Sequence, residues 1–163
     1  TKSDVDGTIP EDASMMNTGI VKYKKIQLLN ANGDTIDRVN YMADINLEMQ
    51  LSSKQTINDV ILDVRITTRD GIEIVHTMNK YDSTEKQALK EGLNQINCKI
   101  KNQLQPGNYS ITIGVHETNG LTMDFVENVL DFSVMQIGEG QEAGYTYDFQ
   151  MAHVRFQSKW EVK

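Results

Sequence analysis

The stretch that decides the fold runs from residue 104 to residue 116 and reads Leu104-Gln105-Pro106-Gly107-Asn108-Tyr109-Ser110-Ile111-Thr112-Ile113-Gly114-Val115-His116. Pro106-Gly107 suits a type II turn, because proline sets φ and glycine accepts the position with φ > 0. After this turn the residues alternate. Tyr109, Ile111, Ile113 and Val115 share one face, while Ser110, Thr112, Gly114 and His116 share the other. This alternation predicts a strand with one face in the core and one face in water.

Tyr109 opens this strand directly after the turn. A buried tyrosine whose hydroxyl bonds the backbone a few residues upstream is the tyrosine corner of immunoglobulin-like sandwiches. An ordinary hairpin is the alternative interpretation of the same stretch.

The same alternation, interrupted by turn residues, predicts the other strands. We expect them at 20–29, 36–41, 45–51, 60–67, 72–78, 96–100 and 129–135. Asn32-Gly33 and Asp70-Gly71 favour two hairpins, and 82–93 is either one short helix or a long loop between sheets. With seven or more strands and little helix, the predicted class is all-β, an immunoglobulin-like antiparallel β-sandwich.

The two ends of the chain differ from this pattern. Residues 1–17 are acidic and lack periodicity, which predicts a flexible linker before a single domain at 18–163. A glycine-rich hinge is expected at 136–148, followed by a terminal strand at 152–162 that contains Val154, Phe156 and Trp160. Such a tethered strand can pair with its own sheet or with that of a second copy.

Composition excludes several classes of function. A chain of 163 residues with a net charge of −7 lacks the basic surface of a nucleic-acid-binding protein. No apolar run approaches the length of a membrane span, and no signal peptide is visible. The single Cys98 cannot form an internal disulfide, which fits a reducing compartment without requiring one.

Motifs of catalysis are missing from the sequence. It has no phosphate-binding loop, no G-x-S-x-G nucleophile motif and no H-E-x-x-H pair. His76, His116 and His153 fall on three different predicted strands, so we expect no metal site and no cofactor. Asp63 and Asp131 are a conceivable carboxylate pair for glycoside hydrolysis, although solvated surface charges are the commoner state of such residues.

The solvent-facing side of the sheet is the remaining candidate for a site. If the strands at 60–67, 72–78, 109–116 and 129–135 share a sheet, its wet face presents Asp63, Arg65, Thr67, Glu73, Thr77, Thr112, His116, Asp131 and Ser133. Such a polar face can hydrogen-bond a sugar chain, although antiparallel sheets also leave one face in water without any ligand. The candidate carbohydrate contacts are Asp63, Arg65, Thr112, His116, Asp131 and Ser133. The candidate stacking rings are Trp160, Tyr145 and Tyr147, each of which can equally serve packing or a loop.

Several short motifs follow one another from about Thr18 to the end of the chain. They are Gly19-Ile20-Val21, Ala31-Asn32-Gly33, Asp70-Gly71, Leu104-Gln105-Pro106-Gly107-Asn108-Tyr109, Leu130-Asp131-Phe132-Ser133-Val134, and Val154-Arg155-Phe156 with Trp160. Their order and spacing resemble those of the carboxy-terminal domain of Wzt-type ABC transporter proteins.

This resemblance implies a non-catalytic carbohydrate-binding module that recognises the end-modified O-antigen polysaccharide for export. It implies a cytoplasmic place at the inner membrane, behind a nucleotide-binding domain and beside a transmembrane transporter subunit. It also implies a homodimer with an exchanged terminal strand, and a ligand face on one sheet. The alternatives are a structural or adhesive immunoglobulin-like spacer without a ligand and, with less support, a glycoside hydrolase.

Overall fold

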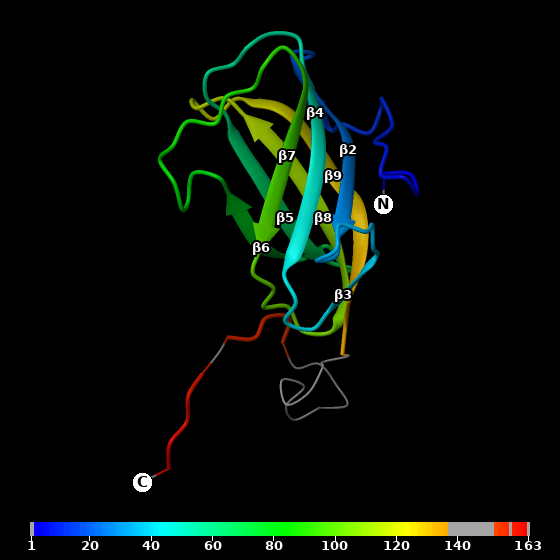
Figure 1. Ribbon diagram of the computed structural model, residues 1–163, viewed down its shortest axis with the longest axis vertical. Helices are drawn as coiled ribbons and strands as arrows, with labels where there is room; N and C mark the ends of the chain where they lie inside the picture. Colours follow the sequence, from blue (N-terminus) through cyan, green and yellow to red (C-terminus); the bar gives the residue numbers. More distant parts are fainter. Residues whose placement is uncertain (1, 137–151, 157, 163) are drawn as a thin grey trace.

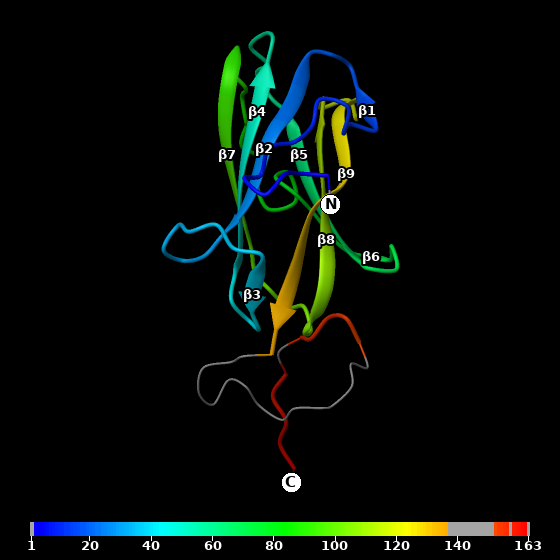
Figure 2. The ribbon, with the colours of Figure 1, turned by 90° about the vertical axis from the view of Figure 1, so that its right-hand side faces the viewer.

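A computed structural model describes residues 2–136, 152–156 and 158–162, and it confirms the all-β sandwich. These residues contain no helix, so 82–91 is a loop that crosses between the sheets, and 92–93 already belong to the strand that follows. Figures 1 and 2 show the two sheets face to face. The smaller sheet has the order β2 (Val21–Leu29), β4 (Ile45–Ser53), β7 (Gly92–Ile100). The larger has the order β1 (Met16–Asn17), β9 (Thr122–Met135), β8 (Gly107–His116), β5 (Ile61–Thr68), β6 (Glu73–Met78), and β3 (Arg38–Asn40) also pairs with β9.

The tyrosine corner forms as expected. The ring of Tyr109 is buried and its hydroxyl donates to the Gln105 carbonyl at 2.6 Å. The same ring packs at 5.7 Å, between ring centroids, against Phe132 of β9. The corner therefore fixes the entry of β8 into the larger sheet.

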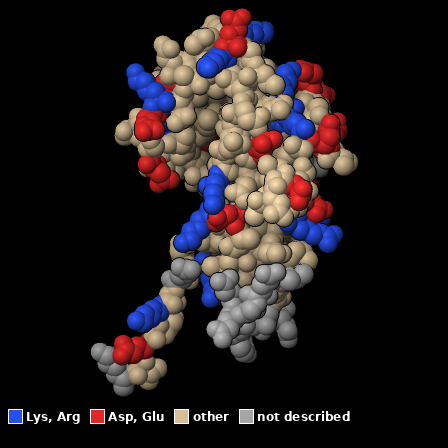
Figure 3. Space-filling model, viewed as in Figure 1, with Lys and Arg blue, Asp and Glu red and all other residues tan. Residues whose placement is uncertain are grey.

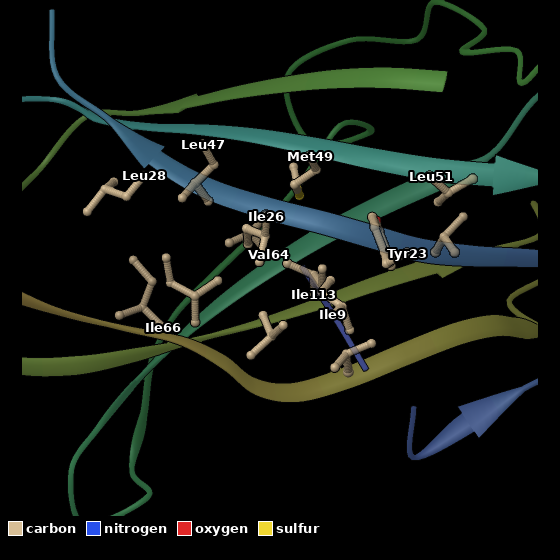
Figure 4. Packing of buried hydrophobic residues seen from close by; sticks show 14 of the residues in the cluster. Ile9, Tyr23, Ile26, Leu28, Leu47, Met49, Leu51, Val64, Ile66 and Ile113 are labelled. Carbon is tan, nitrogen blue, oxygen red and sulfur yellow. The ribbon is translucent and has the colours of Figure 1, made fainter. Parts of the chain in front are cut away.

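Apolar side chains from both sheets meet between them (Figure 4). In β4 every second residue is buried over the whole length of the strand, which is the signature of a half-buried strand. Ile26 and Leu28 of β2 face Ile66 of β5 and Ile113 of β8 across this core, and all four are fully buried.

Tyr23 of β2 joins the two sheets through hydrogen bonds as well as by packing. Its backbone N–H donates to the Asp124 carboxylate of β9 at 2.8 Å, and its hydroxyl donates to the Gly114 carbonyl of β8 at 3.0 Å. Burial, with the nearby charges of Asp63 and Asp124, raises the pKa of Tyr23 well above its ordinary value, so the hydroxyl stays a donor.

One predicted hairpin is confirmed, and the other forms only near its turn. Gly71 takes a φ of 81° in the β5–β6 turn, as Asp70-Gly71 predicted. At Asn32-Gly33 the chain also turns back, with a bridge between Leu29 and Thr35 and a bond from the Ile36 N–H to the Leu28 carbonyl at 2.8 Å. The antiparallel pairing ends there, and β3 runs parallel to the end of β9. Along the outer edge of β9, β1 pairs only with the first part of the strand. β3 pairs with the last part, where it satisfies backbone groups of β9 that β1 does not reach.

The amino-terminal segment also differs from the expected linker. Ile9 and Ala13 lie in the core, and the Ile9 N–H donates to the Lys24 carbonyl at 2.9 Å. These two apolar residues stand among acidic residues, and the segment has no regular alternation of apolar and polar positions. The sequence pattern therefore did not predict that they are buried.

The carboxy-terminal segment forms less structure than expected. Within 152–156 and 158–162 the predicted strand reduces to a single bridge between Leu104 and Val154. Phe156 and Trp160 are exposed. The predicted hinge, apart from Gln136, lies outside the described residues.

Candidate functional site

Four strands bring the predicted polar residues onto one side of the larger sheet, which we call the outer face. β9, β8, β5 and β6 lie side by side in this order, as the polar-face prediction required. One row across β5, β8 and β9 consists of Asp63, Gly114 and Phe125. A second row across the same strands, four residues away along β8, consists of Thr67, Ser110 and Asp131. Five of the six candidate carbohydrate contacts therefore fall into two groups at opposite ends of this face.

The first group, which we call the Asp63 cluster, consists of Asp63, Arg65, His76 and His116. Asp63 is only 2% exposed, so it lies beneath the outer face and not on it as predicted. Its carboxylate is 3.0 Å from Arg65 Nε, 2.9 Å from His116 Nε2 and 3.4 Å from His76 Nε2. Asp63 thus binds Arg65 and His116 directly, and His76 lies next to the same buried carboxylate.

Gly114 explains how a carboxylate can lie so deep. A Cβ atom at this position would overlap Asp63 Oδ1 and lie 2.9 Å from His116 Nε2. The missing side chain leaves the space that the Asp63 carboxylate fills. The requirement at Gly114 is therefore for space, and not for a positive φ.

Arg65 reaches across the outer face. Besides its bond to Asp63, its guanidinium lies 3.3 Å from Glu73 Oε2, and its Cζ lies 5.2 Å from the centroid of the Phe125 ring. Burial lowers the pKa of Arg65, but Asp63 and Glu73 raise it more, so the net value is above the ordinary one. Arg65 is a permanent, oriented cation with 31% of its side chain exposed.

His76 stands where Thr77 was expected. The pairing of β5 with β6 shifts by one residue between Ile66 and Thr67. Ile66 lies opposite Val75, but the next residue, Thr67, lies opposite Glu73, so β6 contains one extra residue, a β-bulge. The strand therefore changes phase, so that His76 pairs with Arg65 on the outer face and Thr77 pairs with inward-facing Val64. No signal in the sequence marks this bulge.

The second group lines a hollow of about 460 Å³ at the other end of the outer face. The predicted residues Asp131 and Ser133 line it, together with Asn108, Ser110 and Arg69, which pattern reading did not select. The Ser110 hydroxyl donates to the Asp131 carboxylate, and the Ser133 hydroxyl donates to Asn108 Oδ1 at 2.7 Å. These alternating hydroxyl, amide and carboxylate groups are the set that can exchange hydrogen bonds with sugar hydroxyls.

The remaining predicted contacts do not join either group. Thr112 is buried, and its hydroxyl oxygen accepts the Asn128 backbone N–H at 3.0 Å, so it supports β9 and is closed to a ligand. Trp160 lies in the exposed terminal segment, and Tyr145 and Tyr147 lie outside the described residues.

The arrangement of carboxylates does not suit glycoside hydrolysis. Asp63 and Asp131 are four residues apart along the strands and two strands apart across the sheet. These offsets amount to roughly 16 Å between Cα atoms, whereas the two carboxylates of a glycosidase lie about 5 to 9.5 Å apart. Asp63 is moreover bound to Arg65.

Over the described parts of the chain, no three His, Cys, Asp or Glu side chains are grouped as metal ligands, and no helix could span a membrane. On the side of the molecule seen in Figure 3, acidic and basic side chains are interspersed, with no basic patch of the kind that tracks phosphates.

Comparisons with known proteins agree with this architecture. The family model of the Wzt C-terminal domain matches residues 13–147. The crystal structure of the C-terminal domain of Wzt superposes with a TM-score of 0.77 at 16% identity, covering 99% of this chain and 96% of that one. A Niemann-Pick type C2 protein from the Japanese carpenter ant has a TM-score of 0.51 at 11% identity, covering 74% and 98% of the two chains. No curated protein sequence matches. The chain belongs to the Wzt C-terminal domain family, a non-catalytic family associated with O-antigen export by ABC transporters.

Proposed function

We propose that this domain binds the end-modified O-antigen polysaccharide through its outer face and so selects finished chains for export. The observation that carries the proposal is the hollow, in which Asp131, Ser133 and Asn108 present hydrogen-bonding groups beside one another on adjacent strands. A rigid sheet holds these groups in place before the ligand arrives, which lowers the entropic cost of binding.

The family context extends this proposal to partners and location. The domain acts at the cytoplasmic side of the inner membrane, joined to a nucleotide-binding domain and working with a transmembrane transporter subunit. It acts as a homodimer in which the terminal segment pairs with the second copy. The exposure of Phe156 and Trp160 in a single chain supports this, because pairing with a partner removes both from water.

The test is direct binding by isothermal titration calorimetry. The probe is the O-polysaccharide released by mild acid from the lipopolysaccharide of the source bacterium, compared with the same chains after removal of the terminal residue. We expect the domain to bind intact chains and to bind shortened chains at least about tenfold more weakly, because a lost set of buried hydrogen bonds costs about 1.4 kcal/mol or more.

Variants then locate the site. Asp131→Ala and Arg65→Ala should each weaken binding while the thermal unfolding curve stays cooperative. Lys99→Ala is the matched control, because Lys99 also forms an ion pair, with Asp44, but on the smaller sheet. If wild type binds none of the chains while folded, the spacer interpretation replaces this proposal.

A further inference from the structure

We infer that Tyr81 is the sugar-stacking ring of this domain. This inference rests on the proposed function and adds to it a second subsite, at the end of the outer face opposite the hollow. No prediction from the sequence selected Tyr81.

The ring of Tyr81 is both exposed and held. It lies just beyond β6, where its backbone N–H donates to the Met78 carbonyl at 3.1 Å. Its hydroxyl bonds His76 Nδ1 at 3.2 Å, and the two rings meet edge to face with centroids 5.7 Å apart. Nevertheless 58% of the residue remains exposed. The ring is therefore held at its hydroxyl and against His76 while it stays open to solvent.

The groups beside Tyr81 continue across the outer face toward a second ring. His76 touches Asp63, Asp63 holds Arg65, and the guanidinium of Arg65 lies over Phe125. The bonds to Asp63 and Glu73 occupy two of the five N–H groups of Arg65. The cluster therefore combines an aromatic face with an oriented hydrogen-bond donor.

This combination matches one side of a pyranose. A pyranose has an apolar face of C–H groups, which packs on an aromatic ring, and an edge of hydroxyl groups, which accept bonds from a guanidinium. Specific small-molecule sites have the same general composition, with an aromatic wall and a few placed polar groups.

The experiment compares three variants in the calorimetric assay with the intact O-polysaccharide. Tyr81→Ala should weaken binding about tenfold, because it removes the stacking surface. Tyr81→Phe keeps the ring and loses only the bond to His76, so we expect a loss of about threefold or less. Leu93→Ala, which truncates a similarly exposed apolar residue (64%) on β7 of the smaller sheet, should leave binding unchanged.

The inference is overturned if Tyr81→Ala binds like wild type, or if Trp160→Ala is instead the aromatic variant that loses binding. Normal binding by Tyr81→Ala alongside weakened binding by Asp131→Ala would remove the second subsite and leave the proposed function intact.

Discussion

At the scale of the residue, Gly114 is the position on which the Asp63 cluster depends. We expect Gly114→Ala to lower the free energy of unfolding by about 1 to 3 kcal/mol, because the new methyl group overlaps the Asp63 carboxylate. Urea denaturation measures this loss. The control is the double-mutant cycle with Asp63→Ala, which removes the overlapping atoms, so the alanine at position 114 should cost less in that background. An equal cost in both backgrounds would contradict the overlap.

At the scale of the element, the hydroxyl of Tyr109 ties the start of β8 to the loop before it. Tyr109→Phe keeps the packing against Phe132 but leaves the Gln105 carbonyl without this donor, so we expect a loss of about 1 to 2 kcal/mol in unfolding free energy. Tyr81→Phe is the control, since its hydroxyl is at the surface and should cost about 0.5 kcal/mol or less. If both variants unfold at the same urea concentration as wild type, the corner does not stabilise the sandwich.

At the scale of the whole molecule, the exposed rings of the terminal segment predict the state of association. Phe156 is 74% exposed and Trp160 is 89% exposed in a single chain. We expect size-exclusion chromatography with light scattering to give a dimer for the wild type and a monomer for the double variant Phe156→Ser/Trp160→Ser, because these rings gain from burial against a partner. Leu121→Ser, at an exposed apolar residue of the β8–β9 turn, is the control and should remain a dimer. A monomeric wild type would refute the exchanged pairing.

The sequence by itself determined the features that depend on neighbouring residues. Alternation with a period of two is local, so β4, β5 and β8 and the all-β class could be predicted from it. The turn chemistry of Asp70-Gly71 and the corner at Tyr109 are local too, and both predictions are confirmed.

Only the tertiary structure decided the features that depend on partners distant in sequence. The pairing of β3 with β9 depends on which backbone groups along the edge of β9 are left without a partner by β1. The bulge that turns His76 outward is set by the register of β5 on β6, and the burial of Asp63 requires the space at Gly114, some fifty positions away. The sequence therefore predicted most of the polar residues that share one sheet face, while the depth and the contacts of each residue on that face were not predicted. A periodic pattern tells which side of a strand faces the core, but the depth of a side chain depends on what the next strand leaves open.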